Sequence, residues 1–137
     1  MIRNILAVLS GIVIGILAIG IFESIGHTLF PVPQDIMQTA ENQDTEALFA
    51  LISPQMLLFV LLAYLLGSFF GGLITSLISK RIMPSIITGG VIMLGGVINL
   101  FMIPHPMWFI LVSFVVYIPF AFIGGLLAMK ILNRFKT

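Results

Sequence analysis

Glu23 and His27 form the first pair of ionisable residues whose spacing suggests chemistry. They lie four residues apart in the segment FESIGHTLFP (22–31). On a helix, this spacing places both side chains on one face, about 6 Å apart along the axis. A carboxyl group and an imidazole on one face can relay a proton when they come within hydrogen-bond distance, and both are metal ligands. The pair therefore indicates a candidate proton, ion or metal site.

His105 and Asn99 are candidates for the same site. The segment 10–27 matches the segment 88–105 at 5 of 18 positions, and both segments end in histidine. Asn99 precedes the second histidine by six residues. We therefore predict one polar site made of Glu23, His27, His105 and Asn99. The alternative is that Glu23 reaches water or headgroups at the membrane boundary and that the histidines are interfacial anchors.

A metal ion is one occupant that this site could take. Glu23, His27 and His105 are the candidate ligands, since two imidazoles and a carboxylate are donor types found in zinc sites. Their spacing matches no recognised zinc motif, and we expect no other cofactor. The chain has no cysteine, which excludes thiolate ligands and a cysteine nucleophile.

Four long apolar stretches must position these side chains. The chain has 137 residues, of which 60% are hydrophobic and 8% charged, whereas soluble domains are about 25% charged. The stretches are 5–26, 56–79, 85–103 and 107–129, and each is long enough to cross a hydrocarbon core of about 30 Å. We predict an all-α membrane bundle of four transmembrane helices in one domain, 1–137, with residues 27–55 joining the first two.

The basic residues indicate the orientation in the membrane. All six fall at the amino terminus, between the second and third stretches, or at the carboxyl terminus: Arg3, Lys80, Arg81, Lys130, Arg134 and Lys136. The positive-inside rule makes that side cytoplasmic. Both termini are then cytoplasmic and residues 27–55 lie on the outer side. No basic patch is large enough to bind nucleic acid.

An internal repeat links the two halves of the chain. Residues 64–81 match residues 117–134 at 7 of 18 positions, including Tyr64 with Tyr117 and a pair of adjacent glycines. The repeat predicts two tandem, parallel helical hairpins. Both tyrosines lie about ten residues into their spans, where we expect each hydroxyl to bond a backbone carbonyl or a serine.

Glycines predict where the helices pack. In lipid, helix association depends on close packing and polar contacts, and small residues allow both. The packing glycines that we predict are Gly11, Gly15, Gly67, Gly71, Gly72, Gly95, Gly96, Gly124 and Gly125. We also predict that the chain forms a homo-oligomer or is a subunit of a complex with another membrane protein.

Three motifs carry a resemblance to known proteins. ESIGH (23–27), the glycine-rich stretch 56–79 and MIPHPMWF (102–109) together resemble short, uncharacterised four-helix proteins of the bacterial inner membrane. The resemblance implies an inner-membrane location and favours a role for Glu23, His27 and His105. It implies no particular activity.

The function that the sequence favours is that of a non-enzymatic integral membrane protein whose outward polar site serves binding or assembly. A small transporter or proton-conducting or ion-conducting protein is the second hypothesis. A membrane enzyme using histidine and carboxylate is third. The sequence contains no Gly-rich phosphate loop, no H-E-x-x-H and no G-x-S-x-G motif.

The predicted orientation can be tested by cysteine labelling. Because the chain has no cysteine, the single substitutions Gln43→Cys and Thr137→Cys each provide one reactive thiol. We expect a membrane-impermeant maleimide to label Gln43→Cys in intact spheroplasts. It should label Thr137→Cys only after the spheroplasts have been lysed. Labelling of both variants before lysis would contradict the predicted orientation.

Overall fold

The computed structural model describes residues 1–31, 52–102 and 105–135. Within these ranges all regular structure is helical, in four helices: α1 (Ile2–Leu29), α4 (Pro54–Ser79), α5 (Met83–Met102) and α6 (Met107–Arg134). The predicted all-α class and the four helices are confirmed. Most of the predicted outer segment 27–55 lies outside the described residues.

Three of the helices have the length and apolar character of membrane spans. They are α1, with 28 residues, α4, with 26, and α6, with 28. In α5 the described apolar stretch, Met83–Asn99, is shorter. Large aliphatic side chains of α1 remain exposed along its length, including Leu9, Val13 and Leu17. An apolar exterior of this kind is what a lipid environment requires.

The ends of α4 follow from local sequence. The hydroxyl of Ser53 accepts a hydrogen bond from the backbone N–H of Met56 at 3.2 Å, and Pro54 occupies the first turn, where no N–H is needed. At the other end Lys80 adopts a left-handed conformation, with φ 58°, and its N–H donates to the carbonyl of Ser76. The chain can then reverse into α5 within three residues, 80–82.

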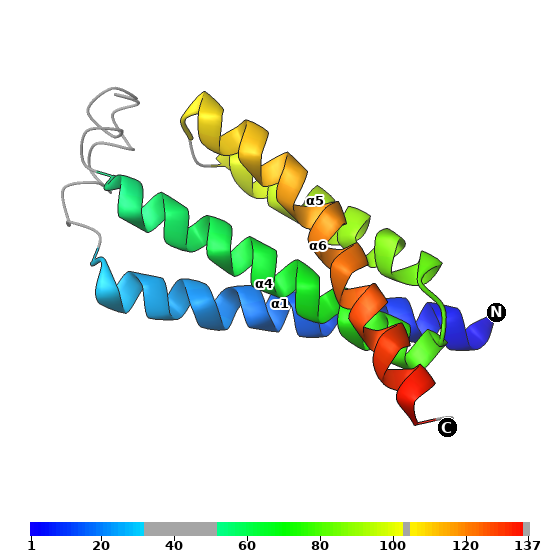
Figure 1. The fold of residues 1–137 in the computed structure, drawn as a ribbon. Coiled ribbons are helices and arrows are strands. Elements are labelled where there is room, and N and C mark those ends of the chain that lie inside the picture. Colours follow the sequence, from blue (N-terminus) through cyan, green and yellow to red (C-terminus); the bar gives the residue numbers. More distant parts are fainter. Residues whose placement is uncertain (32–51, 103–104, 136–137) are drawn as a thin grey trace.

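Helix α4 is the centre of the bundle. It packs along α1 on one side and α6 on the other, and it also contacts α5 (Figure 1). Helix α5 contacts α6 and part of α1, whereas α1 and α6 make no contact within the described ranges. Helices α4 and α5 thus each contact all three other helices, and a site shared by all four helices must lie beside one of these two.

The α1–α4 interface depends on four glycines that face one another in pairs. A Cβ added to Gly11 would lie 2.6 Å from the carbonyl oxygen of Gly71, and one added to Gly71 would lie 2.8 Å from the oxygen of Gly11. Gly15 and Gly67 make the same reciprocal approach, at 2.9 and 2.7 Å. The two backbones are thus too close for any side chain larger than hydrogen at these positions.

The crossing of α4 and α6 is equally close. A Cβ on Gly72 would overlap the backbone of Ala121, and one on Gly124 would overlap the carbonyl of Phe69. Gly96 and Gly125 also approach neighbouring side chains closely. Gly95 is the exception among the predicted packing glycines, because a Cβ there would meet no heavy atom within 4 Å. It is exposed and lies in the wall of an open cavity.

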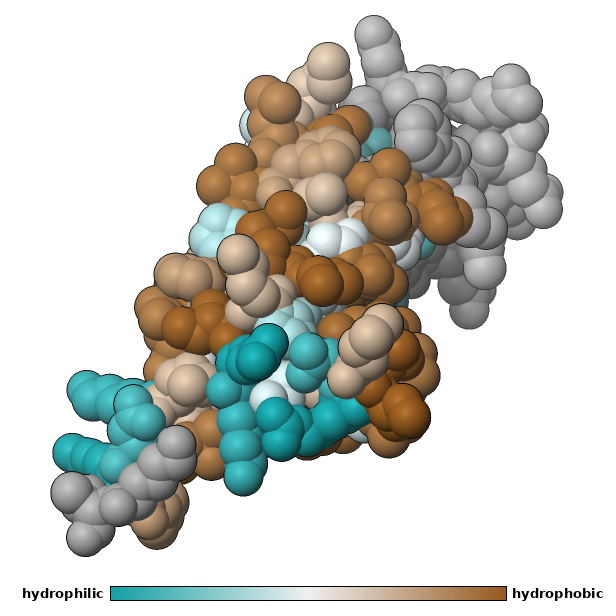
Figure 2. All heavy atoms as spheres, turned by 90° about the vertical axis from the view of Figure 1, so that its right-hand side faces the viewer, coloured by the Kyte–Doolittle hydropathy of each residue, from teal (hydrophilic) through white to brown (hydrophobic). Residues whose placement is uncertain are grey.

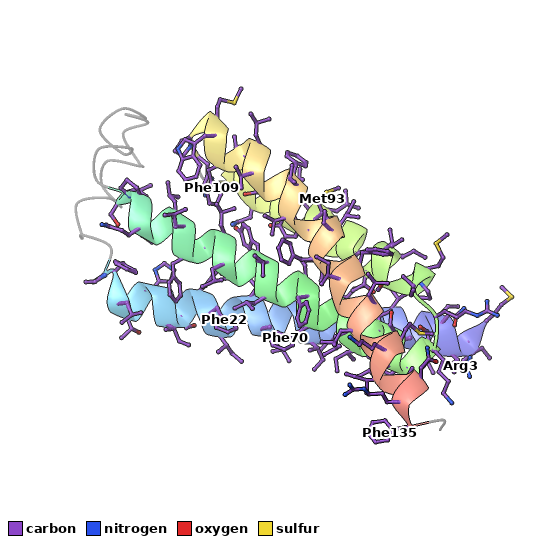
Figure 3. The ribbon with its side chains drawn as sticks, in the orientation of Figure 1. Arg3, Phe22, Phe70, Met93, Phe109 and Phe135 are labelled. Atoms are coloured by element: carbon purple, nitrogen blue, oxygen red, sulfur yellow. The ribbon has the colours of Figure 1, made fainter. Side chains whose placement is uncertain are left out.

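The basic residues within the described ranges gather at one end of the bundle, here called the basic end. The Nη2 of Arg3 donates to the carbonyl of Ser79 at 3.1 Å, which joins the start of α1 to the end of α4. Lys80 borders the same hollow as Leu132 and Asn133 near the end of α6. Figure 2 faces this end, where hydrophilic side chains collect beside an otherwise apolar surface, and Figure 3 places Arg3 and Phe135 there.

Substitution of Gly72 tests whether close backbone approach holds the bundle together. We expect Gly72→Ala to destabilise the fold by about 1–3 kcal/mol, because the added methyl overlaps backbone atoms that cannot move aside. The measurement is unfolding in mixed micelles as the fraction of denaturing detergent increases.

Gly90→Ala provides the matched control, since a Cβ at Gly90 meets nothing within 4 Å. It should leave stability unchanged or raise it slightly, because alanine favours helix more than glycine does. Equal destabilisation by both substitutions would contradict this account of the interface.

Candidate functional site

A cavity of about 570 Å³ lies between α1 and α5. Each of the four helices contributes one polar side chain to its wall: Glu23 from α1, Tyr64 from α4, Asn99 from α5 and Tyr117 from α6. The remaining lining is almost entirely aliphatic. Ile16 and Ile98 in this lining are 56% and 63% exposed, so the cavity opens onto the apolar outer surface of the bundle.

The spacing of residues along α1 explains how the cavity is built on that side. Ile12, Ile16, Ile19 and Glu23 all line it, and their separations of four, three and four residues keep them on one face of a helix. Three aliphatic side chains thus lead along the cavity to one carboxyl group. From Ile12 to Glu23 the helix rises about 16 Å.

Tyr64 and Tyr117 form the polar centre of the cavity. Their rings stack, with centroids 5.2 Å apart and planes at 29°. The amide Nδ2 of Asn99 donates to the hydroxyl oxygen of Tyr64 at 3.2 Å. The predicted partners, a backbone carbonyl or a serine, are therefore wrong for Tyr64, whose hydroxyl accepts a hydrogen bond from a side chain of α5.

Glu23 lies within electrostatic range of both tyrosines. It is partly buried, whereas its neighbours Ser24 and Ile25 face outward. Tyr117 can approach from α6 because Gly96 has no side chain, and a Cβ there would overlap the Tyr117 hydroxyl. The glycine on α5 therefore makes room for the phenol of α6.

The structure separates the two predicted histidines from this cavity. His27 lies one turn beyond Glu23 on α1 and interacts with it electrostatically, but its side chain is exposed and does not line the cavity. His105 precedes α6 and also lies outside the lining. Its ring stacks on Phe109, with centroids 4.9 Å apart and planes at 13°.

Phe109 connects His105 to the tyrosines. Its side chain is fully buried, and its ring lies 6.3 Å from that of Tyr64, on the side of α6 that faces α4 (Figure 3). The indole of Trp108 meets the Phe109 ring edge-on at 5.9 Å. His105 thus lies near the cavity through one intervening ring and not as part of its wall.

The candidate metal ligands do not come together. Among the described residues no three His, Asp or Glu side chains are grouped closely enough to hold a metal ion. The set Glu23, His27 and His105 is therefore not assembled into a metal site. Of the four predicted polar-site residues, Glu23 and Asn99 share the cavity.

Tyr64 and Tyr117 line the cavity, but the sequence analysis did not include them in the polar site and expected them only to bond a backbone carbonyl or a serine. Two signals in the sequence pointed to them: both lie deep in their spans, and they occupy equivalent positions of the internal repeat. The sequence does not reveal the rotation of each helix about its axis, so it could not show that the two rings face each other.

Comparisons with protein-family models, with curated protein sequences and with solved structures found no match. The inference about function therefore rests on the chemistry of the cavity. Tyrosine hydroxyls both donate and accept hydrogen bonds, and a glutamate side chain retains an accepting oxygen whether or not it is protonated. The cavity can thus receive a group that carries N–H or O–H donors, with an apolar portion beside it.

A double-mutant cycle tests the polar network. Tyr64→Phe removes the hydroxyl and Asn99→Leu removes the amide, and we expect a coupling free energy of about 0.6–1.7 kcal/mol, the range for hydrogen bonds between membrane helices. Unfolding in mixed micelles gives the four stabilities required.

Tyr64→Phe combined with Asn4→Leu is the control cycle, because Asn4 lies near the basic end and borders a different hollow. Its coupling should be zero within about 0.5 kcal/mol. A similar coupling in both cycles would mean that Tyr64 and Asn99 have no specific interaction.

Proposed function

We propose that this protein is an integral membrane protein that binds an amphipathic ligand in the cavity formed by Glu23, Tyr64, Asn99 and Tyr117. The head group of this ligand carries N–H or O–H donors, and its apolar tail lies along the aliphatic part of the cavity. The observation that carries the proposal is that each helix supplies one polar side chain to a single cavity that is otherwise aliphatic.

In this proposal all four helices cross the inner membrane of a bacterium. Support comes from the gathering of Arg3, Lys80 and Arg81 at one end, since the positive-inside rule makes that end cytoplasmic. Both termini are then cytoplasmic, and the segment 27–55 lies outside. Helix α5 is the fourth span, with the described apolar stretch Met83–Asn99 in the bilayer.

The direction of the cavity fits a lipid of the outer leaflet. Glu23 lies toward the end of α1 that is opposite to Arg3, whereas Ile12 lies closer to the middle of the helix. A lipid in the outer leaflet likewise has its head group near the surface and its tail directed toward the bilayer centre. The polar and apolar parts of the ligand would therefore meet matching parts of the wall.

The lining favours binding over ion passage. Toward the basic end the cavity is bounded by Ile12 and Ile92, and Ile92 is only 4% exposed. An aliphatic wall of this kind provides no coordination for an ion and no hydrogen-bonded route for a proton.

The tandem repeat and a homo-oligomer remain part of the proposal. Tyr64 and Tyr117, which are equivalent in the repeat, stack on each other, and this contact supports a pseudo-twofold relation between the two hairpins. The exposed aliphatic residues of α1 would meet lipid or a second copy of the chain.

Retention of two lipids with identical tails tests the proposed function. Phosphatidylethanolamine has an ammonium group with N–H donors, whereas phosphatidylcholine has none. We expect native mass spectrometry of the purified protein to show preferential retention of phosphatidylethanolamine. Glu23→Leu should reduce that preference about tenfold, the effect of losing one hydrogen bond to a charged group.

Steric variants provide the control. Ile16→Trp should reduce binding because it fills the cavity, whereas Leu17→Trp should not, since Leu17 has the same 56% exposure but lies outside the lining. Equal retention of the two lipids by the unmodified protein, or an unchanged preference in Glu23→Leu, would overturn the proposal.

A further inference from the structure

A second hollow, of about 380 Å³, lies near the basic end between the start of α1 and the start of α5. Its wall contains Asn4, Ile5, Val8 and Leu9 from α1, together with Arg81, Met83, Pro84 and Ile87. Six of these eight side chains are apolar. The hollow, here called the inner groove, is separate from the cavity that contains Glu23, because the two share no lining residue.

The polar and apolar residues of the inner groove are segregated along its length. Asn4 and Arg81 lie at the end nearest the helix termini, whereas Leu9 and Ile87 lie further into the bundle. Between Asn4 and Leu9 the helix rises about 7.5 Å. The groove therefore has a polar mouth and an apolar interior over a length that suits the glycerol region and the upper part of an acyl chain.

Ser79 fixes both arginines near this mouth. Its side chain is fully buried, its hydroxyl donates to the carbonyl of Arg81 at 3.0 Å, and it accepts from the Arg81 N–H at 3.3 Å. Its own carbonyl accepts the bond from Arg3 at 3.1 Å. The bond to Ser79 uses one of the five N–H donors that the Arg3 guanidinium provides. The backbone of Arg81 and the side chain of Arg3 are thus held in place before any ligand arrives.

The charge at this end selects an anion. Within the described ranges Glu23 is the one acidic residue, and it lies toward the end of α1 that is opposite to the basic end. Arg81 is an exposed residue, and a guanidinium binds phosphate oxygens through paired N–H donors. An exposed arginine beside an apolar groove thus matches a phosphate that is attached to a hydrocarbon chain.

We propose that the inner groove binds one anionic phospholipid of the cytoplasmic leaflet, with its phosphate at Arg81 and an acyl chain between Val8, Leu9 and Ile87. This site is distinct from the proposed outer-leaflet site, because it shares no lining residue with it and selects a head group by its negative charge and not by its hydrogen-bond donors. The orientation agrees with the leaflet, because the mouth lies at the helix termini and the apolar part extends toward the bilayer centre.

Lipid retention by charge variants tests this inference. The intact chain is purified in a mild detergent, supplied with equal amounts of phosphatidylglycerol and phosphatidylcholine that have identical tails, and examined by native mass spectrometry. We expect one phosphatidylglycerol to be retained in preference to phosphatidylcholine. Arg81→Gln should reduce that preference about fivefold, the effect of one cationic side chain at a membrane surface.

Lys130→Gln is the matched charge control. It removes one positive charge from the last two turns of α6, and Lys130 does not line the groove. The phosphatidylglycerol preference should persist in this variant. An equal loss of the phosphatidylglycerol preference in Arg81→Gln and Lys130→Gln would show that the whole basic end attracts anionic lipid. That result would overturn the proposal that the inner groove is a specific site.

A steric pair tests the acyl-chain part. Ile87→Trp should block the groove without changing the charge, whereas Leu6→Trp, at a residue of similar exposure outside the lining, should have no effect. Circular dichroism and unfolding in micelles establish that each variant is folded. Full phosphatidylglycerol retention by a folded Ile87→Trp variant would also overturn the inference, whatever the outcome for Glu23→Leu.

Discussion

Close contact between helix backbones is the constraint on which the rest of this structure depends. Aliphatic side chains gain nothing by leaving lipid for one another, so the helices must associate through surfaces that approach more closely than lipid can. Gly11 with Gly71 and Gly15 with Gly67 provide this along α1 and α4, and Gly72 with Ala121 provides it where α4 meets α6. The polar cavity is a consequence, because Gly96 admits the hydroxyl of Tyr117 from the next helix.

The sequence predicted the helices well because the signal for a span is strong and local. A stretch such as 107–129 contains no charge and is long enough to be read without knowledge of its neighbours. The end of α4 was also predictable, since Lys80 and Arg81 interrupt the apolar residues at the place where the chain turns. These features depend on residues close together in the chain.

The cavity was less predictable because it depends on how four helices are rotated against one another. Glu23 and Asn99, which the sequence singled out, both line the cavity, but spacing alone paired Glu23 with His27, which faces outward. Tyr64 and Tyr117 were noticed for their depth, and their contact could not be deduced from 53 residues of separation along the chain. The repeat was the one sequence signal that joined them.

The single tryptophan, Trp108, which meets the Phe109 ring edge-on, gives the molecule a natural optical reporter. The chain contains one tryptophan and two tyrosines, and both tyrosines belong to the cavity. Excitation energy absorbed by the two phenols can be transferred to this one indole. Trp108 contacts Phe109, and Phe109 in turn contacts Tyr64. Emission from the unlabelled protein therefore reports on the arrangement of the α4–α6 rings without the introduction of a dye.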